Sequence, residues 1–162
     1  MPRIILETKI DAPIYRVFDL ARSIDLHKIS FRDLREKVIA GRKQGLINEH
    51  EYVTWKGKPF LGIPQKLTSA ITIMAGPYFF EDKMLKGPFA KLQHKHFFET
   101  ASDDKTVMKD IFDYSVPFKP LGCIADKLFL RKYLERLLMK RNHLIKIYAE
   151  NDEKWMQILN IY

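Results

Sequence analysis

The sequence has little cysteine and no long hydrophobic run, and both absences narrow what the protein can be. Cys123 is the one cysteine among 162 residues, which excludes an internal disulfide framework and a cysteine-based zinc site. No apolar run approaches the ~20 residues that a membrane-spanning helix requires. The amino-terminal segment meets acidic residues at once and lacks a small-residue cleavage site, unlike a signal peptide. We therefore expect a cytoplasmic protein with no stable membrane insertion.

The charge is one-sided, because 28 Lys and Arg against 20 Asp and Glu give a formal net charge of +8. Such an excess can indicate binding to nucleic acid or to an anionic membrane. The basic residues are spread along the chain, however, and their one dense stretch has the spacing of the solvated face of an amphipathic helix. We therefore predict no specific nucleic-acid partner. The stretch comprises Lys127, Arg131, Lys132, Arg136, Lys140, Arg141 and Lys146.

The hydrophobic pattern changes twice along the chain. Residues 3–10 are rich in β-branched side chains and predict a strand, and the apolar spacing that follows predicts two short helices before residue 30. From about residue 35 to 116 apolar and polar residues alternate, as in half-buried strands. Residues 121–150 return to helical spacing with a wide apolar stripe. The strands expected in the middle region cover 37–40, 47–56, 61–75, 78–84, 89–100 and 105–116.

This order of elements predicts an α+β fold with an antiparallel sheet. We expect seven strands with one apolar face, curled around the long carboxy-terminal helix. The space between sheet and helix is then either packed core or a ligand pocket. The length suits a single core, so residues 1–150 are expected to form one domain. Residues 151–162 are expected to be a carboxy-terminal extension that docks on its own domain or on a neighbour.

Several short stretches resemble, in their order and spacing, the START-like superfamily, also called SRPBCC, and most of all a bacterial ligand-binding subgroup of it. The resemblance implies a helix-grip fold, in which the sheet wraps around the last helix and leaves a cavity. It does not imply one activity, because the superfamily contains carriers, enzymes and regulators. The stretches are Ile10-Asp-Ala-Pro-Ile14, Val17-Phe18, Ser23-Ile-Asp-Leu-His27, Gly45-Leu-Ile47, Glu51-Tyr-Val-Thr-Trp55, Gly87-Pro-Phe89 and His94-Lys-His96 with Phe98, then Thr106, Asp110, Pro117 and Leu121-Gly122.

Polar side chains on the apolar face of the expected sheet are the candidates for chemistry. A symmetric hairpin around residues 102–104 pairs His96 with Asp110 and His94 with Phe112, and both members of a pair point to the same face. Carboxylates and histidines inside an apolar pocket perturb one another's pKa values, which is typical of functional sites. The full set predicted to contact a ligand is Glu51, Trp55, Ile63, Leu67, Phe80, Asp82, Met84, His94, His96, Asp110, Phe112 and Leu128.

Three roles for the polar members of this set remain open. They can hold the polar end of an otherwise apolar ligand, His96 and Asp110 can act as an acid/base pair, or the network can satisfy itself within the sheet. Two histidines and two carboxylates would also supply enough metal ligands. Because no strict zinc motif is present, we predict neither a metal nor a cofactor.

The sequence therefore supports three hypotheses of function. The first is a non-catalytic carrier or sensor that binds a small, largely apolar molecule such as a lipid, an isoprenoid or an aromatic compound. The second is an enzyme of the polyketide aromatase/cyclase type that moves protons with a His/Asp/Glu set. The third is a membrane-surface or partner-binding protein that uses the basic last helix and the tail 155–162. That tail is also the segment through which a homodimer is expected, if one forms.

Overall fold

The computed structural model describes residues 1–60, 63–102, 104–117 and 129–159. The strands are β1 (Arg3–Ile10), β2 (Lys37–Gly41), β3 (Tyr52–Phe60), β4 (Ile63–Ala75), β5 (Phe79–Lys86), β6 (Lys91–Ser102) and β7 (Lys105–Ser115). The helices are α1 (Ile14–Ala21), α2 (Ile24–Ser30), α4 (Arg131–Ala149) and α5 (Asp152–Leu159), with the 3-10 turn η1 (Arg32–Leu34) after α2.

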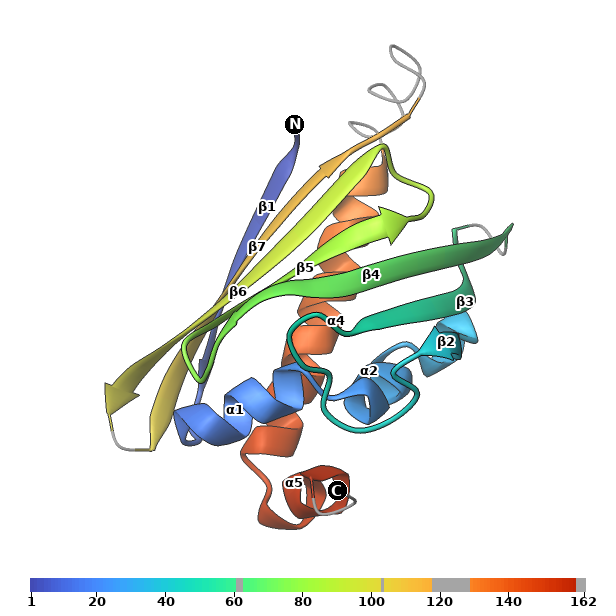
Figure 1. Cartoon of the computed structure of the whole chain (residues 1–162). Helices are drawn as coiled ribbons and strands as arrows, with labels where there is room; N and C mark the ends of the chain where they lie inside the picture. The colour runs from blue at the N-terminus through green and yellow to red at the C-terminus, as the bar shows by residue number, and fades with distance from the viewer. Residues whose placement is uncertain (61–62, 103, 118–128, 160–162) are drawn as a thin grey trace.

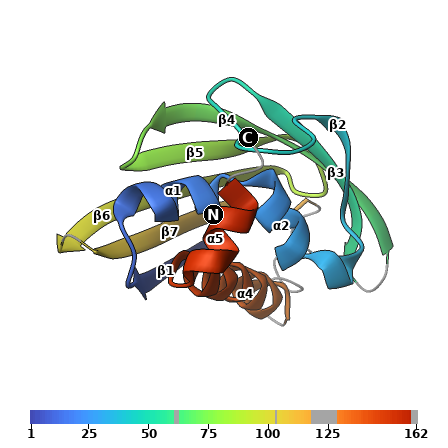
Figure 2. The same cartoon turned by 90° about the horizontal axis from the view of Figure 1, so that it is seen from below.

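The seven strands form one antiparallel sheet in the order β1-β7-β6-β5-β4-β3-β2. The chain crosses from the β1 edge to the β2 edge through α1 and α2, and then adds each strand beside the previous one. The helix α4 packs against β1, α1 and α2 and crosses the sheet (Figure 1). Seen from below, the sheet forms an arc with the helices on its concave side (Figure 2). The predicted α+β helix-grip fold is confirmed.

Two apolar clusters fill the concave side of the sheet. The larger one joins α1 and α2 to the sheet and to the second half of α4. Its centre is Phe18, whose ring meets Phe80 and Phe98 edge to face at 5.7 and 5.4 Å between centroids. The smaller cluster joins β1, β6 and β7 to the first half of α4, where Leu134 and Leu138 are buried. The sheet and α4 are therefore held together at two separate places along the helix.

Two strands differ from the expected pattern. Strand β3 begins at Tyr52, five residues later than predicted, because the chain first makes a turn in which Glu51 bonds the backbone N–H of Asn48 at 2.7 Å. In β4 the register against β5 shifts between Ile71 and Ile73. The shift leaves Ile73 46% exposed and turns Met74 toward the core. The strict alternation predicted for 61–75 therefore fails at its end.

The carboxy-terminal region contains two helices. Helix α4 covers Arg131–Ala149, and the predicted helical residues 121–128 lie outside the described part of the chain. The tail forms α5, which packs on α1 and α4 of its own chain. Ile158 is buried there, and the guanidinium of Arg16 lies 4.4 Å from the ring centre of Trp155. Within the described ranges, no helix is long and apolar enough to span a bilayer.

An ion pair ties the edge strand β1 to β7, and its contribution depends on pH. Arg3 donates two hydrogen bonds to the carboxylate of Asp113, at 2.7 and 2.9 Å, and this contact lowers the pKa of Asp113 below its ordinary value. A carboxyl group whose pKa is lowered by folding stabilises the protein above its unfolded pKa, and that stability is lost as the pH falls through the folded pKa. We expect Arg3→Gln to be less stable than wild type at pH 7, with a difference that shrinks below about pH 4. Urea unfolding of wild type and Arg3→Gln at pH 7 and below about pH 4 measures the difference in stability. A difference that does not change with pH would contradict the expected role of the ion pair.

Candidate functional site

A layer of polar residues, all buried except the half-buried Asp82, separates the two apolar clusters. Along β6, Leu92 belongs to the smaller cluster and Phe98 to the larger, and the two histidines lie between them. The same order holds on β7, where Asp110 lies between Phe112 and Met108. Strand β5 and helix α4 each place polar residues at the same level. The members of this polar layer are Asp82, His94, His96, Asp110, Arg141 and Asn142.

Asp110 is the centre of the layer. The predicted pairing of His96 with Asp110 and of His94 with Phe112 across β6 and β7 is confirmed. Nε2 of His94 lies 2.9 Å from Oδ1 of Asp110, and Nδ1 of His96 lies 2.7 Å from the same oxygen. The second contact lies off the hydrogen-bonding direction, so it is an ion-pair contact without a well-directed hydrogen bond. Nδ2 of Asn142 donates to the other carboxylate oxygen at 2.7 Å.

The electrostatics of Asp110 follow from these contacts. Burial alone would raise the pKa of Asp110, but the contacts with His94 and His96 outweigh it and hold that pKa well below its usual range. For His94 the balance is the reverse. Burial and the neighbouring His96 lower the pKa of His94 more than Asp110 raises it. The layer therefore holds an ionised carboxylate beside an imidazole that favours its neutral form at pH 7.

Asp82 approaches the histidines from the cavity side. Its Oδ1 lies 3.3 Å from Nε2 of His96 and 4.0 Å from Nδ1 of His94. Burial opposes the ionisation of Asp82, but the contact with His96 and the charges around it lower its pKa below the ordinary value. Each histidine thus has one ring nitrogen toward Asp110 and the other toward Asp82.

Arg141 is a member of the layer that the helical pattern assigned to the solvated face, and that prediction is wrong. The residue is 9% exposed, and its Nη2 donates to the carbonyl of Ala21 at the end of α1. Its Nη1 is buried and has no hydrogen-bond partner among the described residues. Burial lowers the pKa of Arg141, while the charges of Asp110 and Asp82 oppose that change. A buried guanidinium with a free donor is energetically costly unless something pairs with it.

His27 and Glu36 form a second polar contact at the cavity that the sequence did not predict. The ring of His27 stacks on Trp55 at 4.1 Å between centroids, and its Nε2 lies 3.1 Å from Oε2 of Glu36. Glycine at position 57 on β3 makes room for this contact, because a Cβ there would lie 2.6 Å from Cγ of Glu36.

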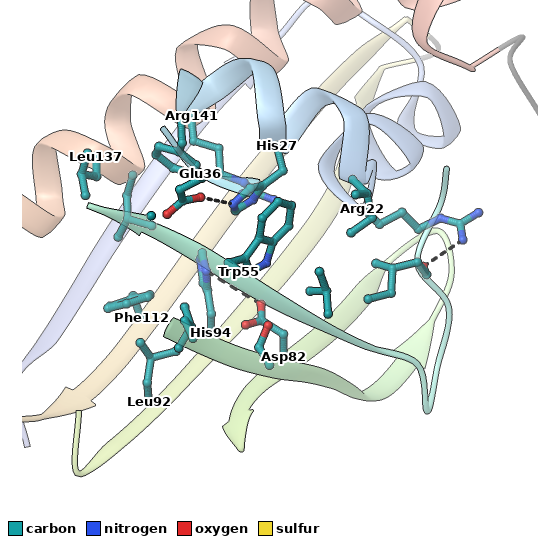
Figure 3. Close-up of a pocket in the computed structure, with 18 of the residues that line it drawn as sticks. Arg22, His27, Glu36, Trp55, Asp82, Leu92, His94, Phe112, Leu137 and Arg141 are labelled. Carbon is teal, nitrogen blue, oxygen red and sulfur yellow. Dashed lines mark hydrogen bonds and ion pairs between the residues drawn. The ribbon is translucent and has the colours of Figure 1, made fainter. Parts of the chain in front are cut away.

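A cavity of about 210 Å³ lies between the sheet, α2 and α4. Most of its wall is apolar, and its polar members include Arg141 and His27 from the helices and Asp82 and His94 from the sheet (Figure 3). This volume is smaller than the 300–1,000 Å³ typical of pockets for drug-sized ligands.

The structure brings together seven of the twelve residues predicted to contact a ligand. Those that line the cavity are Trp55, Leu67, Phe80, Asp82, His94, His96 and Phe112. Asp110 does not line the cavity and lies against the two histidines. Leu128 lies outside the described residues.

Three other residues of the predicted set do not line this cavity. Glu51 lies in the turn before β3 and bonds Arg42 at 3.2 Å, because the strand starts after it. Ile63 is 53% exposed at the far end of β4. Met84 packs against the smaller apolar cluster.

Asp82, His94 and His96 are also the described residues whose donor atoms could hold a metal ion. One donor atom from each lies within 4.8 Å of the other two. All three residues line the cavity, so an ion held there would face the space in which a small molecule fits. The site can therefore support proton transfer, polar ligand contact or metal coordination.

Comparison with known proteins supports the fold. No family model and no curated protein sequence matches the chain. The protein TTHA0849 from Thermus thermophilus has a TM-score of 0.69 at 17% identity, over 89% of this chain and 97% of that one. The Zhui aromatase/cyclase from a Streptomyces species has a TM-score of 0.70 at 12% identity, over 92% and 93%. A START superfamily protein from Mycobacterium smegmatis has a TM-score of 0.61 at 11% identity, over 87% and 97%.

Proposed function

Starting from the helix-grip fold of START-like proteins, which this chain has, we propose that it binds one small, largely apolar molecule with a hydrogen-bond-accepting end, as a non-catalytic carrier or sensor. The observation that carries this proposal is the buried Arg141, with its Nη1 unpaired among the described residues, in the wall of a mostly apolar cavity. Apolar walls with a few polar groups are the usual form of a small-molecule site.

Arg141 indicates the chemistry of the polar end of the ligand. A guanidinium donates hydrogen bonds and accepts none, so its partner must be an acceptor such as a carboxylate or a carbonyl oxygen. A carboxylate would pair with the charge as well as with the donor, which makes the contact stronger. The apolar remainder of the ligand would lie among residues such as Trp55, Leu67 and Phe112. The volume of the cavity favours a short-chain or single-ring molecule over a long-chain lipid.

The experiment compares two probes that differ only at the polar end. Native mass spectrometry of freshly purified protein first identifies any retained molecule, which is then removed by denaturing and refolding. Isothermal titration of the refolded chain with octanoate and with 1-octanol follows. Because a hydrogen bond to a charged group contributes about 1.5–3 kcal/mol, we expect octanoate to bind at least about 10-fold more tightly. Equal affinities would show that Arg141 does not bind the polar end of the ligand. If neither probe binds, the proposal is contradicted.

An enzymatic function is the second candidate, and the protonation of the polar layer is the observation that favours it. His94 tends to be neutral and lies in the cavity wall beside an ionised Asp110, which is the state that a general base requires at neutral pH. One structural neighbour is an aromatase/cyclase, and a reaction of that type moves protons at an activated carbon. A bell-shaped pH–rate profile with a polyketone substrate, lost in His94→Gln, would support the enzyme over the carrier.

A further inference from the structure

We propose that Asp82, His94 and His96 bind a divalent transition-metal ion, with Zn²⁺ as the best fit, in the wall of the cavity. Their donor atoms already lie close to a coordinating arrangement. Oδ1 of Asp82 is 3.3 Å from Nε2 of His96 and 4.0 Å from Nδ1 of His94. Zinc bound at about 2.0–2.2 Å by nitrogen and oxygen in tetrahedral geometry separates its ligand atoms by roughly 3.3 Å. Small side-chain rotations would bring the three donors to these positions.

The backbone prepares this arrangement. His94 and His96 are two residues apart on β6, so their side chains share one face of the sheet. Asp82 is the cross-strand partner of His94 on β5. Three ligands on neighbouring positions of two central strands are held more precisely than ligands on loops.

Asp110 and Asn142 supply the outer contacts that a metal-binding histidine usually has. A histidine ligand generally donates its other ring N–H to a carboxylate or a carbonyl, which fixes its tautomer and orientation. Here Nε2 of His94 lies within hydrogen-bonding distance of Oδ1 of Asp110, at 2.9 Å, and Nδ1 of His96 lies 2.7 Å from the same oxygen but off the hydrogen-bonding direction. Nδ2 of Asn142 donates a hydrogen bond to Oδ2, the other carboxylate oxygen of Asp110. A metal would thus find both imidazoles with the coordinating nitrogens directed to Asp82 and the cavity.

The charges also suit a cation. Asp82 and Asp110 are two carboxylates in the layer, and the guanidinium of Arg141 is the member of the layer whose positive charge acts on both. A divalent ion would more than balance the remaining negative charge. Because all three ligands line the cavity, the ion would keep an open position for water or for a ligand oxygen, as catalytic zinc sites do. The proposal does not depend on which small molecule the cavity holds.

The competing explanation for this arrangement is a hydrogen-bonded network that contains no metal. A doubly protonated His96 between Asp82 and Asp110 would also bring a charged nitrogen to each carboxylate. In that case a hydrogen bond would occupy Oδ1 of Asp82 and Nε2 of His96, and neither atom would be released for a metal. Direct titration with a metal distinguishes the two explanations.

The test uses the full chain without an affinity tag, because a polyhistidine tag would itself bind metal. Chelator-treated protein is titrated with Co²⁺ at pH 7.5, and the visible absorption of the bound ion is recorded. We expect one equivalent to bind with the intense bands of four- or five-coordinate cobalt, and Zn²⁺ to displace it. Weak bands of hexahydrated cobalt at every ratio, or no saturation at one equivalent, would overturn the proposal.

Variants locate the site. Asp82→Asn removes the anionic ligand at similar volume and is expected to weaken Co²⁺ binding by 10-fold or more. Glu51→Gln, which lies in the turn before β3, and His143→Gln, which is exposed on α4, are matched controls that should leave binding unchanged. Unchanged binding in Asp82→Asn would place the ion elsewhere and overturn the proposal. If Asp82→Asn does not fold, X-ray absorption of zinc-loaded wild type decides, because it must show scattering from two imidazole rings.

Discussion

Asp110→Ala is expected to destabilise the protein by about 3–5 kcal/mol, the range observed when one member of a buried charged network is removed. Asp110 is 1% exposed and is the common partner of His94, His96 and Asn142. Without it, the His94 imidazole and the Asn142 amide lose their acceptor, and His96 loses the carboxylate beside its Nδ1, in a layer between two apolar clusters. Because a buried polar group without a partner costs roughly 1–3 kcal/mol, the losses combine into a large effect.

Asp110→Asn provides an internal control for this expectation. Oδ1 of Asn142 is buried and has no partner within the described part of the chain. If the new asparagine presents an NH₂ group to Asn142, a rotation of the Asn142 amide brings that oxygen to it. We therefore expect Asp110→Asn to lose only about 1–3 kcal/mol.

Urea unfolding at pH 7 measures both substitutions, with the denaturant dependence checked for a constant slope. Asp33→Ala, which breaks an exposed contact with Lys140, serves as the surface control and should change stability by less than about 1 kcal/mol. A loss below 1 kcal/mol in Asp110→Ala would show that the histidines do not rely on this carboxylate. The polar layer would then have another source of stability.

The sheet side of the site could be predicted from sequence because strand geometry is strict. Side chains alternate with period two, so His94, His96 and Phe98 had to share a face. The turn predicted at 102–104 then gave the partner of each residue on the next strand, and the pairing of His96 with Asp110 followed. Where the regular period breaks, prediction fails. No residue in the sequence marks the register shift that follows Ile71. The strict alternation predicted for β4 places Ile63 and Ile73 on the apolar face, but both side chains are exposed.

The helix side of the site depends on packing, which local patterns do not determine. Arg141 was assigned to the solvated face because charged residues usually lie there. A signal was nevertheless present, since it lies three residues after Leu138 and four before Ile145, both buried. That spacing places a residue on the apolar stripe. A charged residue at such a position indicates a buried contact, in this case with the carbonyl of Ala21.

The polar layer lies between the two apolar clusters, at positions that apolar side chains fill in most protein cores. Apolar residues at these positions would join the two clusters into one and would avoid the cost of desolvating charges. The hydrogen bonds around Asp110 explain how the layer is tolerated, but they leave Asp82 and Arg141 in the cavity wall. Neither is needed to satisfy Asp110. Because natural proteins keep such groups chiefly at functional sites, these two residues are the strongest indication that the cavity has a function.

Arg141→Gln should therefore affect binding more than folding. We expect the affinity for octanoate to fall about 10- to 100-fold, the equivalent of losing a hydrogen bond to a charged group, while the affinity for 1-octanol, whose uncharged hydroxyl is a weaker acceptor, falls by a smaller factor. Stability should fall by about 1–3 kcal/mol, because the carbonyl of Ala21 loses its donor. Titration calorimetry with both probes, beside urea unfolding, separates the two effects.

Leu138→Ala is the matched control, because Leu138 lies one turn earlier on α4 and also lines the cavity. It enlarges the cavity without changing charge, and should cost about 2–5 kcal/mol of stability while changing the affinities for octanoate and 1-octanol by the same factor. If Arg141→Gln also changes both affinities equally, its guanidinium does not meet the polar end of the ligand. Arg141 would then serve only to join α4 to α1, and the donor to the ligand would have to be sought at His27, His94 or His96, the imidazoles in the same wall.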